Sequence, residues 1–469
     1  MKKLISKTGE PKKRHVWTVL LIFLLSAAAI PASGADTSPA PETATEMTIE
    51  QAIDYAMKHN PDLQSARFET VRREGAAQTA RAALLPQVDV FGDTSHAGHD
   101  HAYPPATAPQ VIRFSDTLFS AGAELKVLVW DFEKTSSELA AARERIVSSQ
   151  FIQDRQKQQV AYDVASLYLK ALTYDDLMEA AQSTRKSLQA LMSQTQELAD
   201  AGRAVPADVL KISARLAQIE SDLATLEAGR RVTVNQLAAD MGYEGDLPPL
   251  VYAVPEKILP VVSESVPELV QEAMTNRPDL VSQQHEIQAA QALKTAAHRS
   301  RWPRIELRGG VYEYAGSNPS SSAGPQAASP DTTTDDWGIG LRVTFPLFDA
   351  GLRAGQIASA TAQAELAKTA ERKLRLNIEK EVKSALAELE SAGKRVEATR
   401  QSVVQAKEVL RNERLKYEAG QSVINFVLDA EAALLTNQSL LKQAQRSVSI
   451  ARLILDLSLG RVHQEWKSL

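Results

Sequence analysis

The feature that most constrains the fold of this 469-residue chain is a long internal repeat. The segment AMKHNPDL, Ala56 to Leu63, returns 217 residues later as AMTNRPDL, Ala273 to Leu280. Matches at this offset or the next continue along the chain: Leu85–Val90 with Trp302–Leu307, Gly92 with Gly309, Trp130–Asp131 with Phe348–Asp349, Gly202 with Gly420, and Gly242 with Gly460. The sequence therefore predicts two copies of one structural unit, a first copy at 48–242 and a second copy at 266–460. The remaining segments are a linker, 243–265, and a C-terminal tail, 461–469.

The N-terminus has the parts of a secretory signal peptide. Basic residues come first, followed by the apolar run Val16–Ile30 and the small residues Ala32–Ala35. Residues 1–35 are therefore predicted to be cleaved on export. A membrane anchor is the alternative, but the apolar run is shorter than the ~20 residues of a spanning helix. Residues 36–47 are rich in Pro, Ala and Thr and are predicted to be a disordered lead-in.

Charge and cysteine content narrow the range of partners. The chain has no cysteine, so it contains neither disulfides nor the cysteine that carries a bacterial lipid anchor. Residues 1–35 hold six Lys or Arg and one Glu, so their removal changes the formal net charge from -5 to -10. Because the exported chain is acidic, we expect no nucleic-acid partner. No later stretch is long and apolar enough for a transmembrane helix, so a membrane location would require strands.

Each copy begins with a helical stretch and continues into a β-hairpin. The helical stretches, 48–84 and 266–301, each contain a proline, Pro61 or Pro278, that is predicted to kink or interrupt the helix. The hairpins are predicted at 87–131 and 304–348, where the apolar period changes from helical to alternating. The last strand is the clearest, with these large apolar residues on one face: Trp337, Ile339, Leu341, Val343 and Phe345. The loops inside both hairpins are rich in Gly, Pro, Ser and Ala and are not expected to build a core.

A very long helix follows each hairpin. Residues 133–200 and 351–418 contain no proline and would each form a helix of roughly 100 Å. Both show the 4,3 spacing of a coiled-coil seam. The seam of the second helix is Ile378, Val382, Ala385, Leu389, Ala392, Val396, Thr399, Val403, Ala406, Leu410, Glu413 and Tyr417. After a glycine turn, shorter helices return at 206–242 and 423–460. The opening and returning helices together match the long helix in length, so we expect them to stack end to end along it.

The strands predict an assembly. Two hairpins supply four strands per chain, whereas a closed membrane barrel needs at least about eight. Four strands alone would leave unpaired edges, which lipid does not permit. Either several chains share one barrel or the strands form a small sheet outside the membrane. Three chains would supply twelve strands.

The order of these elements resembles the TolC family of outer-membrane efflux proteins. The residues that carry the resemblance are NPDL at Asn60–Leu63, RPDL at Arg277–Leu280, FPLFDAG at Phe345–Gly351 and YEAGQSVINFVLDAE at Tyr417–Glu431. The resemblance implies a mainly α fold with a small β part. In it, long antiparallel coiled-coil helices form a periplasmic α-barrel, and four strands per chain join a shared 12-stranded transmembrane β-barrel in a homotrimer. The implied location is the outer membrane of a Gram-negative bacterium, in contact with outer-membrane lipid and extending into the periplasm.

The function implied by the resemblance is passive conduction. Such a protein is the outer-membrane duct of a tripartite efflux or type I secretion system. It receives substrate from an inner-membrane transporter through a periplasmic adaptor protein, with no enzymatic activity and no cofactor. The alternative is a periplasmic coiled-coil adaptor or spacer, although two complete units with strands between their helices argue against it. The sequence does not indicate which substrate is exported.

The resemblance also implies a gate at the helix-turn end. By position, Asp429 corresponds to an acidic ring of the pore, and Phe426 stands where some members carry a second carboxylate. Asp208 and Tyr417 correspond to a pair that links the two turn regions, and Ser422 replaces a basic residue that often follows the glycine turn. The implied gate has one charged ring, one apolar ring and a lighter latch.

These gate residues have plainer explanations as well. Asp208 lies in the first turn of a helix, where the helix dipole favours a carboxylate. Asp429 would equally suit a solvated helix face, and Tyr417 would equally suit the last position of its coiled-coil seam. Both explanations remain open at this point.

Two further groups of residues complete the candidate sites. The resemblance implies that the turns contact the adaptor, through Gly202, Arg203, Gly420 and Gln421. The segment HAGHDH places His96, His99 and His101 at spacings that a metal would accept. This cluster lies in a loop without a rigid support or a remote fourth ligand, so we expect an external loop and no metal site. No motif of nucleophilic or phosphate chemistry is present in the sequence.

Overall fold

The computed structural model describes residues 46–96, 101–103, 112–114, 117–251, 265–316 and 332–461. The predicted signal peptide, most of the lead-in, residues 252–264 of the linker and the tail after Arg461 lie outside the described residues. The described chain from Glu46 onwards belongs to one compact unit, so the two copies do not fold as separate domains.

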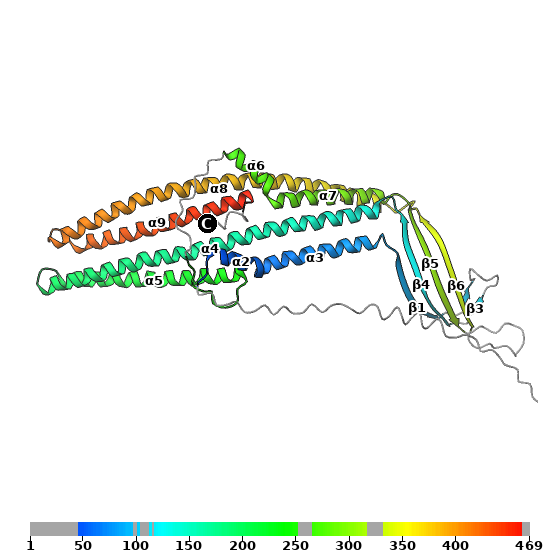
Figure 1. Ribbon diagram of the computed structural model, residues 1–469, viewed down its shortest axis with the longest axis horizontal. Coiled ribbons are helices and arrows are strands. Elements are labelled where there is room, and N and C mark those ends of the chain that lie inside the picture. The colour runs from blue at the N-terminus through cyan, green and yellow to red at the C-terminus, as the bar shows by residue number, and fades with distance from the viewer. Residues whose placement is uncertain are drawn as a thin grey trace, which may run out of the picture. The chain divides into compact units, whose positions relative to one another are not determined.

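The elements follow the same order in both copies (Figure 1). The first copy contains α2 (Ile49–His59), α3 (Pro61–Ala82), β1 (Gln87–His96), β4 (Thr117–Trp130), α4 (Lys134–Asp200) and α5 (Pro206–Met241). The second copy contains α6 (Val266–Asn276), α7 (Pro278–Arg299), β5 (Arg304–Gly316), β6 (Thr332–Thr344), α8 (Leu352–Glu418) and α9 (Ile424–Leu459). The predicted fold class, mainly helical with a small β part and a tandem repeat, is confirmed.

The loop of the first hairpin differs from the expectation. It contains two short strands, β2 (His101–Tyr103) and β3 (Ile112–Phe114), which pair with each other in antiparallel fashion. The composition of this loop gave no period-2 signal, because three-residue strands are too short to show one. The second strand of the hairpin also begins at Thr117, earlier than its most apolar part, Glu124–Trp130, indicates.

The opening helical stretch of each copy is interrupted at its proline. Asn60 takes an extended conformation, and its side-chain oxygen accepts a hydrogen bond from Leu63 N at 2.9 Å, so it caps α3. Pro61 fills the first position of α3, where a missing N–H costs nothing. The returning helix α5 ends at Gly242, where a Cβ atom would lie 2.4 Å from His59 O. The repeated NPDL segment therefore marks the place where the end of α5 meets the break between α2 and α3.

End-to-end stacking involves only the second part of each opening stretch. α3 and α5 both pack along α4, whereas α2 lies beside them and shares a buried cluster with α4 and the end of α5. This cluster contains Ala52, Ala56, Val164, Tyr168, Leu237 and Met241. α6 packs in the same way against α8 and α9. The predicted interruption at each proline is confirmed, because the residue before it is held out of the helical region. The expected stacking of the whole opening stretch along the long helix holds only for its second part.

The long helices organise the rest of the fold. α4 and α8 each contain 67 residues and are about 100 Å long. α4 packs against α3, α5, α7 and α9, while α8 packs against α6, α7 and α9 (Figure 1). No predicted seam residue of α8 is exposed, so the coiled-coil pattern is confirmed. Among the described residues, no helix combines the length and the apolar character needed to cross a bilayer.

The four main strands form one antiparallel sheet in the order β1-β4-β5-β6. β4 of the first copy pairs with β5 of the second, so the sheet joins the two copies. One face of the sheet is apolar and open to its surroundings; its exposed members include Val88, Val90, Val311, Trp337, Ile339, Leu341 and Val343. The other face carries charged residues that pair across or along the strands, such as Lys126 with Asp89 at 3.2 Å. In the described residues, the outer edges of β1 and β6 have no strand partner.

Candidate functional site

The two helix turns share one backbone geometry. Gly202 and Gly420 take φ values of +70° and +71°, a conformation that glycine adopts without strain. In each turn the following residue closes a hydrogen bond back to the helix: Arg203 N to Leu198 O at 2.7 Å and Gln421 N to Lys416 O at 2.8 Å. All four turn residues expected to contact an adaptor, Gly202, Arg203, Gly420 and Gln421, are exposed.

Phe426 and Asp429 lie on one exposed face of α9, one helical turn apart. Phe426 is 57% exposed, which is unusual for an aromatic side chain. The opposite face of the same turns is buried with α4, α5 and α8 and contains Ile424, Val427 and Ala430. Within the described part of the chain, the carboxylate of Asp429 makes no hydrogen bond or ion pair. The first turns of α9 therefore direct an aromatic ring and an unpaired acid away from the core of the chain.

The structure gives two of the three predicted latch residues, Asp208 and Ser422, a local partner. Asp208 accepts a hydrogen bond from Lys211 Nζ at 3.3 Å, within the first turn of α5. Ser422 donates to Glu413 Oε2 at 3.1 Å, and Glu413 also pairs with Lys416 at 2.7 Å. The hydrogen bond from Lys416 is the main reason that the pKa of Glu413 lies below its ordinary value. Ser422 is thus held within its own helical hairpin.

Tyr417 lies between the two hairpins. Its hydroxyl group is buried and faces Thr195 of α4. Burial is the main cause that raises the pKa of Tyr417; the negative charge of Asp208 raises it further, and the neighbouring Thr195 side chain lowers it. The structure therefore brings Tyr417 within electrostatic range of Asp208, but its buried hydroxyl group makes no hydrogen bond to Asp208 or to the neighbouring Thr195. Tyr417 packs between α8 and α4, the position expected of the last residue of the coiled-coil seam.

One buried connection between the hairpins was not predicted from the sequence. Glu431 is almost fully buried, with a side-chain exposure of 3%, and its carboxylate pairs with the Arg414 guanidinium. Ser187 of α4 donates to the same carboxylate at 2.9 Å and also contacts Arg414. We call Ser187, Arg414 and Glu431 the buried triad. It ties α8 and α9 of the second copy to α4 of the first.

The surroundings of the buried triad are loosely packed. A cavity of about 220 Å³ lies beside it, between α4 and α8, and is lined by Leu191, Gln194, Arg414, Tyr417 and Glu418 among others. Gln194 donates to Glu418 across the cavity at 3.3 Å. The sequence carried one signal for this site, because Glu431 stands seven residues after Ile424 on the buried stripe of α9. A carboxylate at such a position requires a cationic partner.

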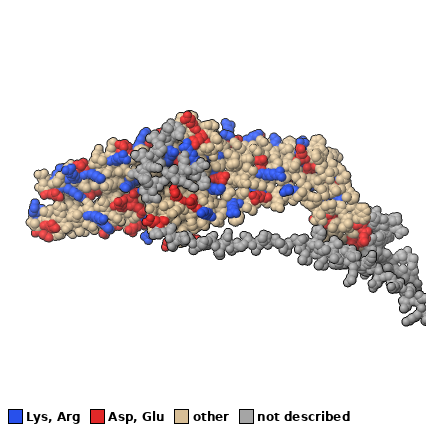
Figure 2. Space-filling model, in the orientation of Figure 1, with Lys and Arg blue, Asp and Glu red and all other residues tan. Residues whose placement is uncertain are grey.

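The histidine cluster is only partly within the described chain. His96 ends β1 and is exposed, while His99 and the side chain of His101 lie outside the described residues. Elsewhere in the described segments, no group of three His, Cys, Asp or Glu side chains is arranged to hold a metal ion. On the face seen in Figure 2, acidic and basic residues are interspersed along the helices, without a field of one sign.

The long helical hairpins, the repeated turns and the two-faced sheet define a class of proteins in which long coiled-coil helices continue from a sheet with one exposed apolar face. The sequence profile of the outer membrane efflux protein family matches residues 52–243 and 269–461. The chain therefore belongs to the outer membrane efflux protein family, which locates it in the outer membrane of a Gram-negative bacterium with a part in the periplasm. This is a family of transport proteins rather than enzymes.

Individual relatives agree with this assignment. Nodulation protein T of Rhizobium leguminosarum bv. trifolii is 22% identical over 87% of this chain and 84% of its own length. The outer membrane efflux protein BepC of Brucella suis is 24% identical over 93% of this chain and 90% of its own. A crystal structure of CusC, described in terms of transmembrane channel formation, aligns with a TM-score of 0.73 at 21% identity, covering 88% of this chain and 92% of the other. The fold is therefore that of solved outer-membrane channels.

Proposed function

We propose that this protein is the outer-membrane duct of a tripartite efflux or type I secretion system. Three chains would join their sheets, β6 of one to β1 of the next, into a twelve-stranded barrel, and their long helices would continue the passage through the periplasm. The observation that carries this proposal is the sheet, whose apolar face is exposed and whose two edges are unpaired. Such a sheet is stable in lipid only when other strands complete it.

The gate of the proposed duct lies at the helix turns. Phe426 and Asp429 would face the passage, because they are the exposed residues on the first turns of α9 and point away from the core. The buried triad and the contact of Tyr417 with Thr195 would hold the second hairpin against α4 in the closed state. The exposed turn residues, Gly202, Arg203, Gly420 and Gln421, would contact a periplasmic adaptor that connects the duct to an inner-membrane transporter.

An acidic ring at Asp429 would favour the passage of cations. The substrate itself would be selected by the inner-membrane transporter. The alternative of a periplasmic adaptor or spacer is not supported by the family assignment. It also leaves the exposed apolar face of the sheet without a role.

The test is conductance across a planar bilayer, with the oligomer mass determined on the same detergent-extracted sample. We expect a three-chain complex and a small, cation-preferring conductance. The Asp429→Lys variant should weaken or reverse that preference while the complex keeps its mass. A complex without conductance under any condition would contradict the duct, and an unchanged cation preference in Asp429→Lys would remove Asp429 from the passage.

A further inference from the structure

The end of the sheet next to the helices carries a belt of aromatic side chains. Trp130 stands opposite Ile305 at the end of β4, on the apolar face of the sheet. The centroid of the Phe132 ring lies 5.9 Å from that of Trp130 and 5.1 Å from that of Trp302, on which it stacks. Aromatic rings gather at the level of the lipid headgroups, where a protein surface leaves the hydrocarbon of a bilayer. The belt therefore marks the edge of the membrane on the side of the helices.

The connection between β6 and α8 adds apolar groups at the same end of the sheet. Phe345 continues the apolar side of β6 beyond Val343. Leu347 and Phe348 follow, and their side chains are 86% and 87% exposed. Such side chains are unfavourable in water and favourable in hydrocarbon. This connection therefore belongs at the boundary of the bilayer, together with the aromatic belt.

A groove beside the aromatic belt is lined by basic side chains. It lies where α7 meets the sheet (Figure 1), has a volume of about 620 Å³, and is lined by Lys294, His298, Arg299, Arg301, Trp302 and Phe345 among others. Lys294, His298 and Arg301 follow one another at intervals of four and three residues, so they form one stripe at the end of α7. No acidic side chain of the described chain lines this groove. It thus combines an aromatic wall with a basic one, and we call it the basic groove.

The basic stripe has no partner of its own. In the part of the chain that the structure describes, the side chains of Lys294, His298 and Arg301 make no hydrogen bond and no ion pair. All three are at least partly exposed, and Arg301 is fully so. Their donors are therefore available to a ligand that brings negative charge to the groove.

Two acids near the basic groove do not neutralise it. Arg299 lies 3.7 Å from Glu133, whose side chain is 65% exposed, so their attraction is weak. Glu365 of α8 acts on Lys294 from a distance but forms its ion pair with Lys368, at 2.9 Å. The groove therefore keeps an excess of positive charge.

The first copy of the repeat does not have this stripe. The equivalent place is the end of α3, where Arg81 is the basic residue. Ala77, Ala82 and Leu84 stand at the other three positions. The repeated fold therefore forms without the basic side chains, and their presence in the second copy calls for another reason.

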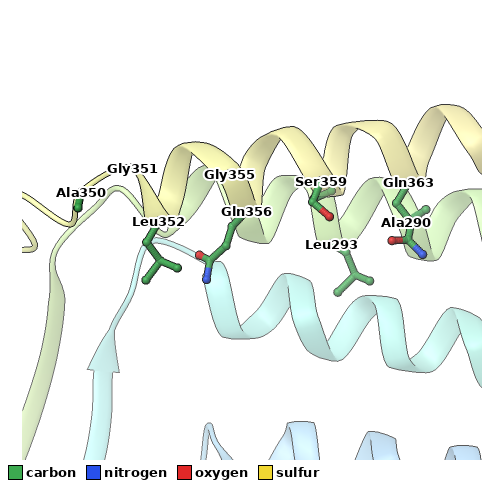
Figure 3. Close-up of a pocket in the computed structure, with 10 residues that line it drawn as sticks. Ala290, Leu293, Ala350, Gly351, Leu352, Gly355, Gln356, Ser359 and Gln363 are labelled. Atoms are coloured by element: carbon green, nitrogen blue, oxygen red, sulfur yellow. The ribbon is translucent and has the colours of Figure 1, made fainter.

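A second groove on α7 shows that the charge is local. It has a volume of about 670 Å³ and lies between α7 and the start of α8, where it is lined by Leu293, Leu352, Gln356, Ser359 and Gln363 among others (Figure 3). Within the described residues, no charged side chain lines it. Of these two grooves on α7, the basic one is therefore the one suited to an anion.

We propose that the basic groove binds the headgroup of an anionic phospholipid from the adjoining leaflet of the outer membrane. Lys294, His298 and Arg301 contact its phosphate group, as basic pockets at a membrane surface do. The acyl chains run past Trp302 and Phe345 onto the apolar face of the sheet. A dissolved phosphate ion would gain the first set of contacts but not the second, so the lipid is the occupant that fits both walls.

This lipid site goes beyond the conduction of substrates. A lipid held at the end of α7 fixes the depth at which the sheet stands in the bilayer. The site requires that the apolar face of the sheet lies in lipid, as it does in the proposed duct. It does not depend on the gate at the helix turns.

The test counts the lipids that stay bound to the full-length protein. The detergent-extracted complex is mixed with phosphatidylglycerol, which is anionic, or with phosphatidylethanolamine, which carries no net charge, and is weighed by native mass spectrometry. We expect one phosphatidylglycerol for each chain, bound at least about fivefold more tightly than phosphatidylethanolamine. Inorganic phosphate at millimolar concentration should not displace it.

A double variant tests the residues. Lys294→Gln with Arg301→Gln should weaken the binding of phosphatidylglycerol about tenfold, because each basic residue near a lipid surface adds to the attraction. The control Lys394→Gln with Arg400→Gln removes the same charge from exposed positions of α8, about 60 Å from its start, and should bind as the parent does. Arg81→Gln, in the first copy, should also bind as the parent does.

The outcomes separate the lipid site from the duct. Equal binding of the two lipids, displacement by inorganic phosphate, or equal losses in the variant and its control would overturn the lipid site and leave the duct intact. A complex that binds phosphatidylglycerol through Lys294 and Arg301 but never conducts would support the site and contradict the duct.

Discussion

The two helix turns have the same backbone geometry but expose side chains of different chemistry. Asp208 and Lys211 of the first copy occupy the positions of Phe426 and Asp429 in the second. In the first turn the acid and the base neutralise each other at 3.3 Å, whereas the second turn exposes an aromatic ring and an unpaired acid. The duplicated unit therefore fixes the backbone, and a few side chains decide which turn is structural and which carries the candidate gate.

The largest expected effect comes from the buried triad, which only the second copy has. Arg414→Ala leaves the carboxylate of Glu431 buried without its cation, which should lower the free energy of unfolding by about 3 kcal/mol. This loss of stability is at the low end of the range for breaking a buried ion pair, because the Arg414 side chain is 37% exposed. Urea unfolding of the full chain in detergent measures it.

The matched control for Arg414→Ala is Gln196→Ala, at the equivalent position of α4. Gln196 makes only an exposed hydrogen bond to Asp200, so its loss should change stability by less than about 0.5 kcal/mol. Equal losses in the two variants would show that the triad does not distinguish the copies. Arg414→Ala should also raise conductance, if the triad holds the gate closed.

A second comparison concerns the effect of low pH on the two helix breaks, one between α2 and α3 and the other between α6 and α7. Arg277 replaces Asn60 in the second copy, is buried, and pairs with Asp279 at 2.6 Å and with Glu381. Burial raises the pKa of Asp279, but the Arg277 guanidinium outweighs it, so the pKa lies below its ordinary value. The stability gained from this pair is fully present above about pH 4, the ordinary range of an aspartate, and is lost as the pH falls through the lowered pKa.

The substitution Asp279→Asn should remove this acid dependence. The variant should be less stable than the parent at pH 7, and the difference should shrink as the pH is lowered towards 3. The control is Asp62→Asn. Asp62 is the equivalent of Asp279 in the first copy, where the uncharged Asn60 stands in place of Arg277. Thermal unfolding at several pH values measures both, and a difference that grows at low pH would contradict the assignment.

The glycine turns should respond equally in both copies. Gly202→Ala and Gly420→Ala force an alanine into the left-handed region, at a cost of about 1 kcal/mol each. A Cβ atom at either position meets no other atom within 4 Å, so backbone strain is the only contribution. Unequal losses in unfolding experiments would show that the turns are not equivalent in backbone.

The smallest effect on stability is expected from exchanging the turn surfaces. Phe426→Asp combined with Asp429→Lys gives the second turn the side chains of the first. All affected groups are exposed in the single chain, so stability should change by less than about 0.5 kcal/mol. Cation preference in bilayer conductance should nevertheless be lost. If the variant kept its cation preference, the side chains at 426 and 429 would not be what distinguishes the two turns.

Local patterns in the sequence predicted most of the fold. The apolar periodicity of two long segments without proline predicted the two long helices, and Gly202 and Gly420 predicted where these helices end. The extra strands β2 and β3 and the separate position of α2 could not be predicted. In the first case the strands are too short to show a period, and in the second the direction of a chain after an extended residue depends on tertiary contacts.

The candidate site was less predictable than the fold. Phe426 and Asp429 are named only because the family resemblance at the turn motif implies them, and the structure places both on the exposed face opposite Ile424 and Val427. The buried triad joins Ser187 to a carboxylate 244 residues later, and no local pattern identifies that partner. Glu431 on an apolar stripe signals that a cation must be near, but only the packing of α8 against α9 shows that it is Arg414.

The pairing of β4 with β5 has a consequence for biosynthesis. β4 forms its first hairpin with β1, but its other edge waits for a strand that is made much later, since Leu118 pairs with Gly316. Contacts between such distant residues form slowly, and an exposed strand edge invites aggregation in the meantime. A truncated product ending in the linker would therefore expose one edge of β4 and be an aggregation hazard.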